Sequence, residues 1–414
     1  MLKTRDGRDA AGRPKCGLCT ILSTVIVSLI AVAVVLSLVF IYVNTQRIRK
    51  DAADNNEYLK DLVRKVNENP KSTWKAKFNK FGSKARDYEG LKTPKNETAI
   101  AEYFELLEKF FEWDILKTHI KTLQEFPEDD LPEQFDARQK WPGCPSISNV
   151  PNQGGCGSCY AVAAVGVAAD RACIQSNGTY KSLFSEEDVL GCCAVCGNCL
   201  GGDPLKALTY WVQEGLVTGG RDGCRPYSFD ISCGVPCSPM VFPENEKSRS
   251  CVRRCQNIYY QNKYEEDKNY ASVAYSMYPR GMTLSDDGKR RGKVPTIIGH
   301  INSTMEEPIT LEEIRTILKT ELFLYGPTTM AFPVPEEFLH YSEGVFRPIT
   351  EEKFNDRVVY WHVARLIGWG KDKDGSHYWL CVNSFGRNWG DNGVFKINVD
   401  SMEQYGLEYE AALI

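Results

Sequence analysis

Residues 152–165 read Asn-Gln-Gly-Gly-Cys-Gly-Ser-Cys-Tyr-Ala-Val-Ala-Ala-Val, and they are the most informative segment of the chain. Its glycines indicate a tight loop, and its second half predicts a helix of small residues that can lie deep in a core. Cys159 begins that helix, where unpaired backbone N–H groups and the positive end of the helix dipole favour a thiolate. Gln153 lies six residues earlier, where its side-chain N–H could help to hold an oxyanion.

Two residues far downstream complete this pattern. His362 and Asn383 lie in apolar, strand-like runs. An early cysteine followed by a distant histidine and asparagine is the order expected of a papain-like thiol protease. On the loop alone, Cys156 and Cys159 could instead form a disulfide, half of a metal site or a redox pair. The redox pair would need Cys156 to be free.

Several motifs resemble the papain family, and its cathepsin B branch in particular. They include the loop around Cys159, the strand around His362 and the segment Asn-Ser-Phe-Gly-x-x-Trp-Gly that begins at Asn383. Residues 131–138 are similar to the start of a mature cathepsin B, and residues 223–228, Gly-Cys-Arg-Pro-Tyr-Ser, form a motif of that branch.

The resemblance covers about residues 56–414 and implies an α+β, papain-like fold with two lobes. One lobe is helical and the other is an antiparallel, β-barrel-like sheet. Strand signals follow the helical first half of this part, at residues 328–332, 358–366, 377–382 and 393–397. Cys159 is then expected on the helical lobe and His362 on the sheet lobe, facing each other across a cleft.

The resemblance also implies a role for each site residue. Cys159 would be the nucleophile, His362 would stabilise its thiolate and protonate the leaving amine, and Asn383 would orient the imidazole. Gln153 and the backbone N–H of Cys159 would form the oxyanion hole. The residues expected to bind a protein or peptide substrate are Gly201, Gly202, Glu410, Trp389 and Trp361. Glu410 would lie at the floor of a specificity pocket, unless it is an exposed charge near the C-terminus.

The chain has 16 cysteines, and the resemblance implies how twelve of them pair. The implied disulfides are Cys144–Cys173, Cys156–Cys199, Cys192–Cys251, Cys193–Cys196, Cys224–Cys255 and Cys233–Cys237. Spacing alone does not give this connectivity. Cys159 and Cys381 remain unpaired, as a thiol nucleophile requires. The alternative is a zinc site formed by Cys192, Cys193, Cys196 and Cys199, which an oxidising compartment disfavours.

The N-terminal part predicts a membrane anchor. Residues 21–43 carry no charge and are long enough to span a bilayer as a helix. More basic residues precede this run than follow it, so residues 1–20 are expected in the cytosol and the rest in the lumen or outside the cell. The chain would then be a single-pass type II membrane protein, endolysosomal or at the cell surface or secreted. The alternative is a cleaved signal peptide.

Three glycosylation motifs agree with a lumenal location, at Asn96, Asn177 and Asn302. Residues 44–130 are polar and mostly helical in pattern, and the segment from Tyr58 to Phe81 resembles a cathepsin B propeptide. This pro-region is expected to inhibit the peptidase domain, residues 131–414, by lying in its cleft, where cystatin-like inhibitors would also bind. Residues 125–130 form a plausible cleavage region. The alternative is a stalk or accessory domain.

The chain departs from the cathepsin B pattern at several positions. No histidine occurs between Cys224 and Cys255, although cathepsin B carries there two adjacent histidines that bind a substrate's C-terminal carboxylate. We therefore expect endopeptidase activity without efficient carboxydipeptidase activity. Unusual aromatic residues near the site are Tyr160, Trp361 and Phe385. Residues 281–304 are an insertion, expected to be a solvated loop.

A second class of function is also consistent with these departures. The chain would then be a catalytically weak or silent homologue that binds peptides or inhibitors. A net charge of −4 gives no sign of a nucleic-acid partner, and no metal or organic cofactor is implied.

Overall fold

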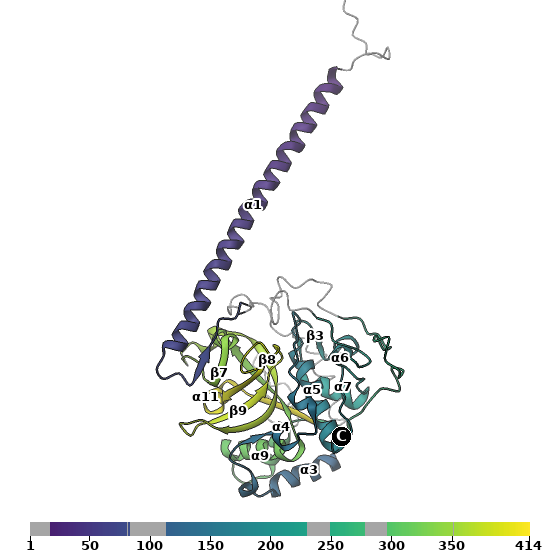
Figure 1. The fold of residues 1–414 in the computed structure, drawn as a ribbon, viewed down its shortest axis with the longest axis vertical. Coiled ribbons are helices and arrows are strands. Elements are labelled where there is room, and N and C mark those ends of the chain that lie inside the picture. The colour runs from purple at the N-terminus through teal and green to yellow at the C-terminus, as the bar shows by residue number, and fades with distance from the viewer. Residues whose placement is uncertain (1–16, 81, 83–112, 230–248, 278–295, 351) are drawn as a thin grey trace, which may run out of the picture. The chain divides into compact units, whose positions relative to one another are not determined.

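The computed structural model describes residues 17–80, 82, 113–229, 249–277, 296–350 and 352–414 (Figure 1). The chain divides into two compact units, Met1–Lys60 and Asp61–Ile414. Some expected features therefore lie outside the described residues. They are most of the cytosolic tail, Phe81, Asn96 and the rest of residues 83–112 of the pro-region, the Cys233–Cys237 disulfide, and residues 281–295 of the insertion.

The first unit consists mainly of a helix. Helix α1 runs from Gly17 to Glu68 and continues into the second unit. Its stretch Ile21–Arg47, 27 residues, is long and apolar enough to cross a membrane, and its apolar side chains are exposed. A helix that is apolar on all sides and exposed in the described structure is typical of a membrane span, although a signal sequence has the same composition.

In the second unit, short helices form one lobe (Figure 1). They are α5 (Cys159–Gln175), α6 (Glu186–Cys192) and α7 (Pro204–Gln213). Two small strands, β3 (Gly197–Asn198) and β4 (Gly201–Gly202), pair beside them. Helix α5 is buried on nearly all sides because alanine and valine fill most of its positions, so neighbouring elements approach it closely.

A nine-stranded sheet forms the other lobe. Its strands are β1 (Trp74–Ala76), β2 (Phe135–Asp136), β5 (Val273–Ser276), β6 (Thr328–Pro335), β7 (Tyr341–Phe346), β8 (Val358–Lys371), β9 (His377–Val382), β10 (Val394–Asn398) and β11 (Glu408–Leu413). They follow the order β1-β7-β10-β9-β8-β6-β11-β5, with β2 on β8, and all pairs except β7–β10 are antiparallel. The four strands expected from the sequence are confirmed as parts of β6, β8, β9 and β10.

The remaining elements surround the sheet lobe. They are α3 (Trp113–Glu125), α4 (Ala137–Lys140), α8 (Ile297–Thr304), α9 (Leu311–Tyr325), α10 (Phe354–Arg357) and α11 (Val399–Met402), with 3-10 turns at η2 (Glu128–Asp130), η3 (Pro145–Ser148), η5 (Glu336–His340) and η6 (Glu403–Tyr405). Helix α4 packs against β2 and β8 of the sheet lobe. Helix α9 begins with a capping box between Thr310 and Glu313. Helix α8 shows that the expected loop at residues 281–304 is wrong at its C-terminal end, because Ile297, Ile298 and Ile301 are buried there.

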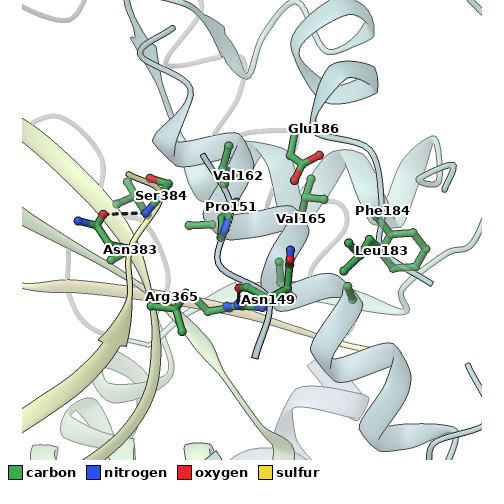
Figure 2. A pocket seen from close by; sticks show the side chains of 16 residues that line it. Asn149, Pro151, Val162, Val165, Leu183, Phe184, Glu186, Arg365, Asn383 and Ser384 are labelled. Atoms are coloured by element: carbon green, nitrogen blue, oxygen red, sulfur yellow. Dashed lines mark hydrogen bonds between the residues drawn. The ribbon is translucent and has the colours of Figure 1, made fainter. Parts of the chain in front are cut away.

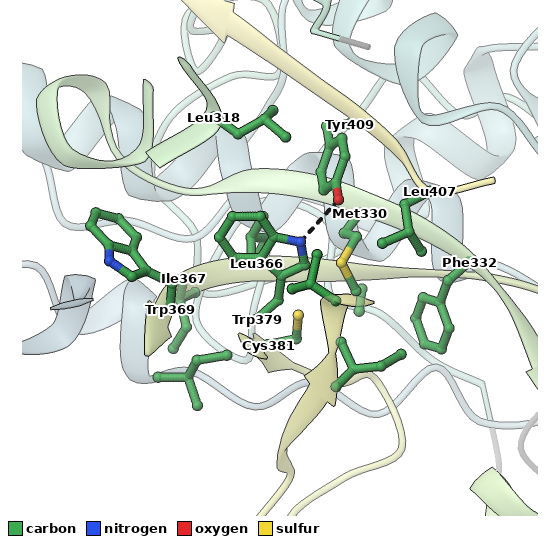
Figure 3. Close-up of a cluster of buried hydrophobic side chains, with 14 of the residues drawn as sticks. Leu318, Met330, Phe332, Leu366, Ile367, Trp369, Trp379, Cys381, Leu407 and Tyr409 are labelled. Carbon is green, nitrogen blue, oxygen red and sulfur yellow. Dashed lines mark hydrogen bonds between the residues drawn. The ribbon is translucent and has the colours of Figure 1, made fainter. Parts of the chain in front are cut away.

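The core of the sheet lobe is apolar and aromatic (Figure 3). Figure 3 shows Cys381 among Trp379, Leu366 and Met330, and the indole Nε1 of Trp379 donates to the hydroxyl of Tyr409 at 2.9 Å. Cys381 is unpaired and fully buried, and burial raises its pKa well above the ordinary thiol value. It therefore packs as a small apolar side chain and is inert as a nucleophile.

Candidate active site

The expected nucleophile stands at the N-terminal end of α5, held by the loop before it. Cys159 is the first residue of the helix, has no disulfide and is partly exposed. Cys156 is bonded to Cys199, and the N–H of Gly157 donates to the carbonyl of Cys199 at 2.8 Å. A Cβ on Gly157 would lie 2.6 Å from that carbonyl oxygen, so only glycine fits there. With Cys156 in a disulfide, the redox-pair alternative loses its second thiol.

The expected histidine and asparagine meet inside the sheet lobe. His362 lies on β8, Asn383 follows the end of β9, and His362 Nε2 lies 2.7 Å from Asn383 Oδ1. The Asn383 Oδ1 atom also accepts from the backbone N–H of Ser384 at 2.8 Å. Since this oxygen can only accept, Nε2 must carry the ring proton, which leaves Nδ1 as the proton acceptor of the neutral imidazole. Among the described residues, the buried Nδ1 has no hydrogen-bond partner.

Aromatic rings cover the His362–Asn383 hydrogen bond. The ring of Phe385 lies 4.8 Å from the imidazole, and Phe332 contacts it edge to face at 5.8 Å. Phe385 is 6% exposed and packs in turn against Trp389. Phe385, one of the unusual aromatic residues noted in the sequence, therefore contributes an apolar surface beside this buried hydrogen bond.

Gln153 is fixed by four hydrogen bonds. Its Nε2 donates to the carbonyl of Cys156 at 2.9 Å, and its Oε1 accepts from the hydroxyl of Ser384 at 2.6 Å. Its backbone N–H donates to the carbonyl of Ser384, and its own carbonyl accepts from the hydroxyl of Tyr227. A side-chain amide nitrogen carries two hydrogens, so the second hydrogen on Nε2 remains for an oxyanion.

The electrostatics of the pair correspond to a silent form. Burial raises the pKa of Cys159 to about 11, although backbone hydrogen bonds at Val363, at Tyr160 and at its own amide oppose the effect. Burial lowers the pKa of His362 to about 4, and the bond to Asn383 opposes that shift. Both shifts favour the neutral form of each group, because a charge on either is poorly solvated.

The expected substrate-binding residues fall into two groups. Glu410 on β11 is fully buried, and its Oε2 accepts from the hydroxyl of Thr329 on β6 at 2.7 Å, so an exposed terminal charge is excluded. Trp389 is buried and donates to the carbonyl of Leu339 at 3.1 Å. By contrast, Trp361 is 53% exposed beside His362.

The glycine pair forms the exposed edge of the β3–β4 ribbon. Gly201 and Gly202 are both partly exposed. Gly201 has a φ of +128°, and a Cβ on Gly202 would lie 2.3 Å from the carbonyl oxygen of Cys196. Glycine therefore suits both positions, one because of its positive φ and the other because of the close backbone contact.

Five of the six implied disulfides are present, and the sixth lies outside the described residues. They are Cys144–Cys173, Cys156–Cys199, Cys192–Cys251, Cys193–Cys196 and Cys224–Cys255. The four cysteines of the zinc alternative are all used in these bonds. Within the described residues, no cluster of three or more His, Cys, Asp and Glu side chains could hold a metal. Two glycosylation motifs are described, and Asn177 and Asn302 are both exposed.

Two supporting groups escaped the sequence analysis. Tyr227, from the motif at residues 223–228, donates to the carbonyl of Gln153 at 2.6 Å and receives a bond from the hydroxyl of Ser158. Arg225 of the same motif is buried and paired with Asp188 at 2.7 Å. The motif at residues 223–228 was the available signal for both residues, because a turn alone does not require an arginine and a tyrosine at these positions. The second group is the ion pair between Arg365 and Asp170, which no local sequence pattern indicates.

A small cavity lies between the lobes, next to this ion pair (Figure 2). Figure 2 shows Val162 and Val165 of α5 on one side and Arg365 and Asn383 on the other. Its volume is about 20 Å³, which is room for a single water and not for a substrate side chain. Glu186 also lines it, and burial raises the pKa of that carboxyl to about 7.

Comparisons with known proteins agree with this geometry. Residues 131–414 match the family described as papain family cysteine protease. The chain is 36% identical over 291 residues to "Cathepsin B-like cysteine proteinase 4" of Caenorhabditis elegans, which covers 68% of this chain and 74% of that protein. It is 34% identical over 280 residues to "Cathepsin B-like cysteine proteinase" of Schistosoma japonicum, which covers 65% and 68%.

Solved structures show the same fold. Procathepsin B S9 from Trypanosoma congolense superposes with a TM-score of 0.54 at 21% identity, covering 85% of this chain and 97% of that one. The proform of the ragweed pollen cysteine protease Amb a 11 gives 0.53 at 18% identity, with 88% of each chain covered. The expected two-lobed α+β fold is confirmed by these structures.

Proposed function

Because the chain belongs to the papain family of cysteine proteases, and to its cathepsin B-like branch, we propose that it is a membrane-anchored zymogen whose mature domain cuts within protein chains. One observation carries the proposal. The imidazole of His362 is fixed by Asn383 with its proton on Nε2, so Nδ1 is left to take the thiol proton. Cys159 supplies that thiol from a helix N-terminus, where a thiolate is favoured once the site is solvated.

The proposed reaction has two halves. The Sγ thiolate of Cys159 attacks the peptide carbonyl carbon, and the carbonyl π electrons move to oxygen. The oxyanion is held by Gln153 Nε2 and the backbone N–H of Cys159. As the intermediate collapses, the C–N bond breaks and the His362 imidazolium gives its proton to the leaving amine. Water then attacks the thioester, with His362 taking its proton, and releases the carboxylic acid and the thiol.

Specificity would come from the residues around the site. Gly201 and Gly202 would pair with an extended substrate through their backbone, which neither glycine hinders. Glu410 would accept a basic side chain at the floor of a pocket, since its carboxylate is buried and desolvated. Trp361 and Trp389 would contact the substrate as aromatic surfaces. Cystatin-like inhibitors would use the same cleft.

The pro-region is proposed to be the domain's own inhibitor. One described element of it, β1, lies on the sheet lobe, where it pairs antiparallel with β7. Trp74 is 4% exposed, packs against Phe346 and donates to the carbonyl of Arg347 at 2.9 Å. The shifted pKa values of Cys159 and His362 agree with a latent form, because a charge on either group is poorly solvated in it.

The proposed organisation follows from the sequence boundaries. Residues 1–20 are cytosolic, 21–43 anchor the chain as a type II membrane protein, 44–130 form the pro-region and 131–414 the peptidase domain. The support is the apolar helix and the exposure of Asn177 and Asn302, which glycosylation on the lumenal side would require. The compartment would be endolysosomal or extracellular.

A silent homologue is the second candidate. Two observations favour it: the shifted pKa values of Cys159 and His362, and the bulky, exposed Trp361 beside the histidine. Alkylation with iodoacetamide distinguishes the two. In the acid-matured protein, an active site would be alkylated at Cys159 at a pH where ordinary thiols are protonated, whereas Cys381 would stay unmodified. Equal inertness of both thiols after maturation would favour the silent homologue.

A further inference from the structure

Helix α3 lies in the segment assigned above to the pro-region, yet it packs as part of the peptidase core. Leu116, His119, Ile120 and Leu123 form one face of the helix, and each is at most 5% exposed. The spacing of these residues is that of an amphipathic helix facing a core. Leu116, Ile120 and Leu123 belong to the same buried cluster as the inner face of α9, which includes Ile314, Ile317 and Leu318.

A buried hydrogen bond between a histidine and a carboxylate connects α3 to α9. His119 Nε2 lies 2.7 Å from Glu321 Oε2, and the side chains are 2% and 0% exposed. The imidazole also packs against the rings of Tyr325 and Tyr275, at 4.4 and 5.1 Å between centroids. Removal of His119 would therefore leave the buried carboxylate of Glu321 without one of its partners.

Glu321 extends this contact to the helix that carries the nucleophile. Its Oε1 accepts from Arg171 Nη2 at 2.8 Å and from the hydroxyl of Tyr275 at 2.7 Å. Arg171 lies on α5, twelve residues after Cys159, and its guanidinium also donates to the carbonyls of Gly326, Pro327 and Ala412. Thus α3 contacts a network that joins α5, α9 and the C-terminal strand.

We propose that α3 is a permanent partner of the peptidase domain, bound to α9, and that it stays there when the pro-segment carrying β1 is removed. This rests on the proposed function only in assuming that the chain matures by proteolysis. The surface of the peptidase domain under α3 is suited to an amphipathic helix with a histidine opposite Glu321. Helix α3 of this chain is that helix.

The charges at this interface are suited to acid conditions. The groups that face His119 are Glu321 and Tyr325 of α9 and Tyr275 of β5, with Arg171 of α5 behind them. Burial opposes ionisation of Glu321, but the positive charges of His119 and Arg171 outweigh it and hold its pKa at about 2. Glu321 therefore remains an anion at the pH of an acidic compartment and can keep its contacts with α3 and α5 there.

The test uses the full chain in detergent, made inactive by Cys159→Ala. Recognition sites for a sequence-specific protease are inserted after Gly82 and after Phe126, which separates the chain into three pieces. After cutting, the pieces are separated by gel filtration at neutral and at acid pH and identified by mass. We expect the middle piece, which contains α3, to elute with the peptidase domain at both pH values. Elution of the middle piece alone at either pH would overturn the proposal.

Matched variants locate the contact on α3. Leu116 is fully buried, whereas its neighbour Ile115 is 36% exposed. In the Leu116→Asp protein the middle piece should elute apart from the peptidase domain. In the Ile115→Asp protein it should still elute with the domain. If the middle piece stays with the domain in both variants, the assigned interface is wrong. If Leu116→Asp does not fold, the gel filtration of the protein without either substitution still tests the proposal. Since the nucleophile is absent throughout, the result does not depend on whether the chain is a protease.

Discussion

Arg365 on β8 and Asp170 on α5 form a buried ion pair, with Nη1 2.8 Å from Oδ2. Arg365 lies three residues after His362 on the same strand, and Asp170 lies on the same helix as Cys159. The guanidinium also donates to the carbonyls of Ser146 and Asn149. This pair therefore fixes the helix that carries the thiol against the strand that carries the imidazole.

Replacing Arg365 should destabilise the domain in a way that depends on pH. Burial raises the pKa of Asp170 to about 6, and the charge of Arg365 limits that rise. In Arg365→Leu, an unpaired buried carboxylate should lower the free energy of unfolding by about 3–5 kcal/mol near neutral pH. A raised pKa means that the folded state binds the proton more tightly, so part of this loss should be recovered as pH falls below the folded pKa. Denaturant unfolding at neutral and acid pH, on the Cys159→Ala background, measures both.

The control for this prediction is an exposed pair. Arg253 lies 3.4 Å from Glu214, and both side chains are largely exposed. Arg253→Leu should change the free energy of unfolding by less than about 1 kcal/mol, since such pairs contribute little. A loss in Arg365→Leu that is as small as the control, or that does not vary with pH, would contradict the proposed anchor.

Acid should loosen the contact between the pro-segment and the sheet lobe through His340. Its Nδ1 accepts the backbone N–H of Asn79 at 3.0 Å, and its ring stacks on Phe78. Burial lowers the pKa of His340 from 6.5 to about 4, and hydrogen bonding with the Lys77 backbone opposes the shift. The docked form thus resists protonation, so docking should weaken by about tenfold per pH unit as pH falls through that window. The pH profile of pro-segment release, followed by gel filtration of the protein cut after Gly82, measures it.

His340→Asn is the matched variant for this switch. The Asn Oδ1 can accept the Asn79 N–H but does not titrate, so release should lose most of its dependence on pH in this window. An unchanged pH profile would mean that another group controls release.

Gln153 should act in the transition state. Gln153→Ala removes the proposed oxyanion donor, and kcat should fall about 100- to 1,000-fold with little change in KM. Ser384→Ala removes the bond that positions Gln153 Oε1 and should cost less. Steady-state kinetics on one peptide substrate compares the two. A fall confined to KM would assign Gln153 to ground-state binding instead.

Glu410 should control specificity for basic side chains. In Glu410→Gln, kcat/KM for a peptide with arginine in the pocket should fall about 10- to 100-fold, because a charge-assisted hydrogen bond is lost. The matched peptide with phenylalanine should be cleaved nearly as before. Equal losses on both peptides would show that Glu410 supports the structure through Thr329 and does not contact substrate.

The sequence predicted local features better than long-range partners. Strand β9 has the expected bounds, His377–Val382, because its apolar run is short and bordered by polar residues. Helix α8 was missed because its buried isoleucines follow a basic, insertion-like stretch. The disulfide pairing came from the resemblance, since spacing alone leaves many connectivities open.

The buried ion pairs could not be predicted from the sequence. Asp170 and Arg365 are 195 residues apart, and His119 and Glu321 are 202 apart. No local pattern indicates that such residues are in contact. From the sequence alone, a charged residue in an apolar helix is expected at an exposed position. The catalytic residues were easier to predict from the sequence, because each lies in a recognisable local motif. The site itself is formed by segments that are far apart in the chain.

The most direct test of the central claim is cleavage of one quenched peptide in two forms, with a free C-terminal acid and with a C-terminal amide. The acid-matured protein is used with Cys159→Ala as the control, and the products are identified by mass. We predict internal cuts at similar rates on both forms, absent in the control. Stepwise loss of dipeptides from the free acid alone would contradict the proposed lack of carboxydipeptidase activity. The absence of any cleavage that depends on Cys159 would contradict the proposed protease and favour the silent homologue.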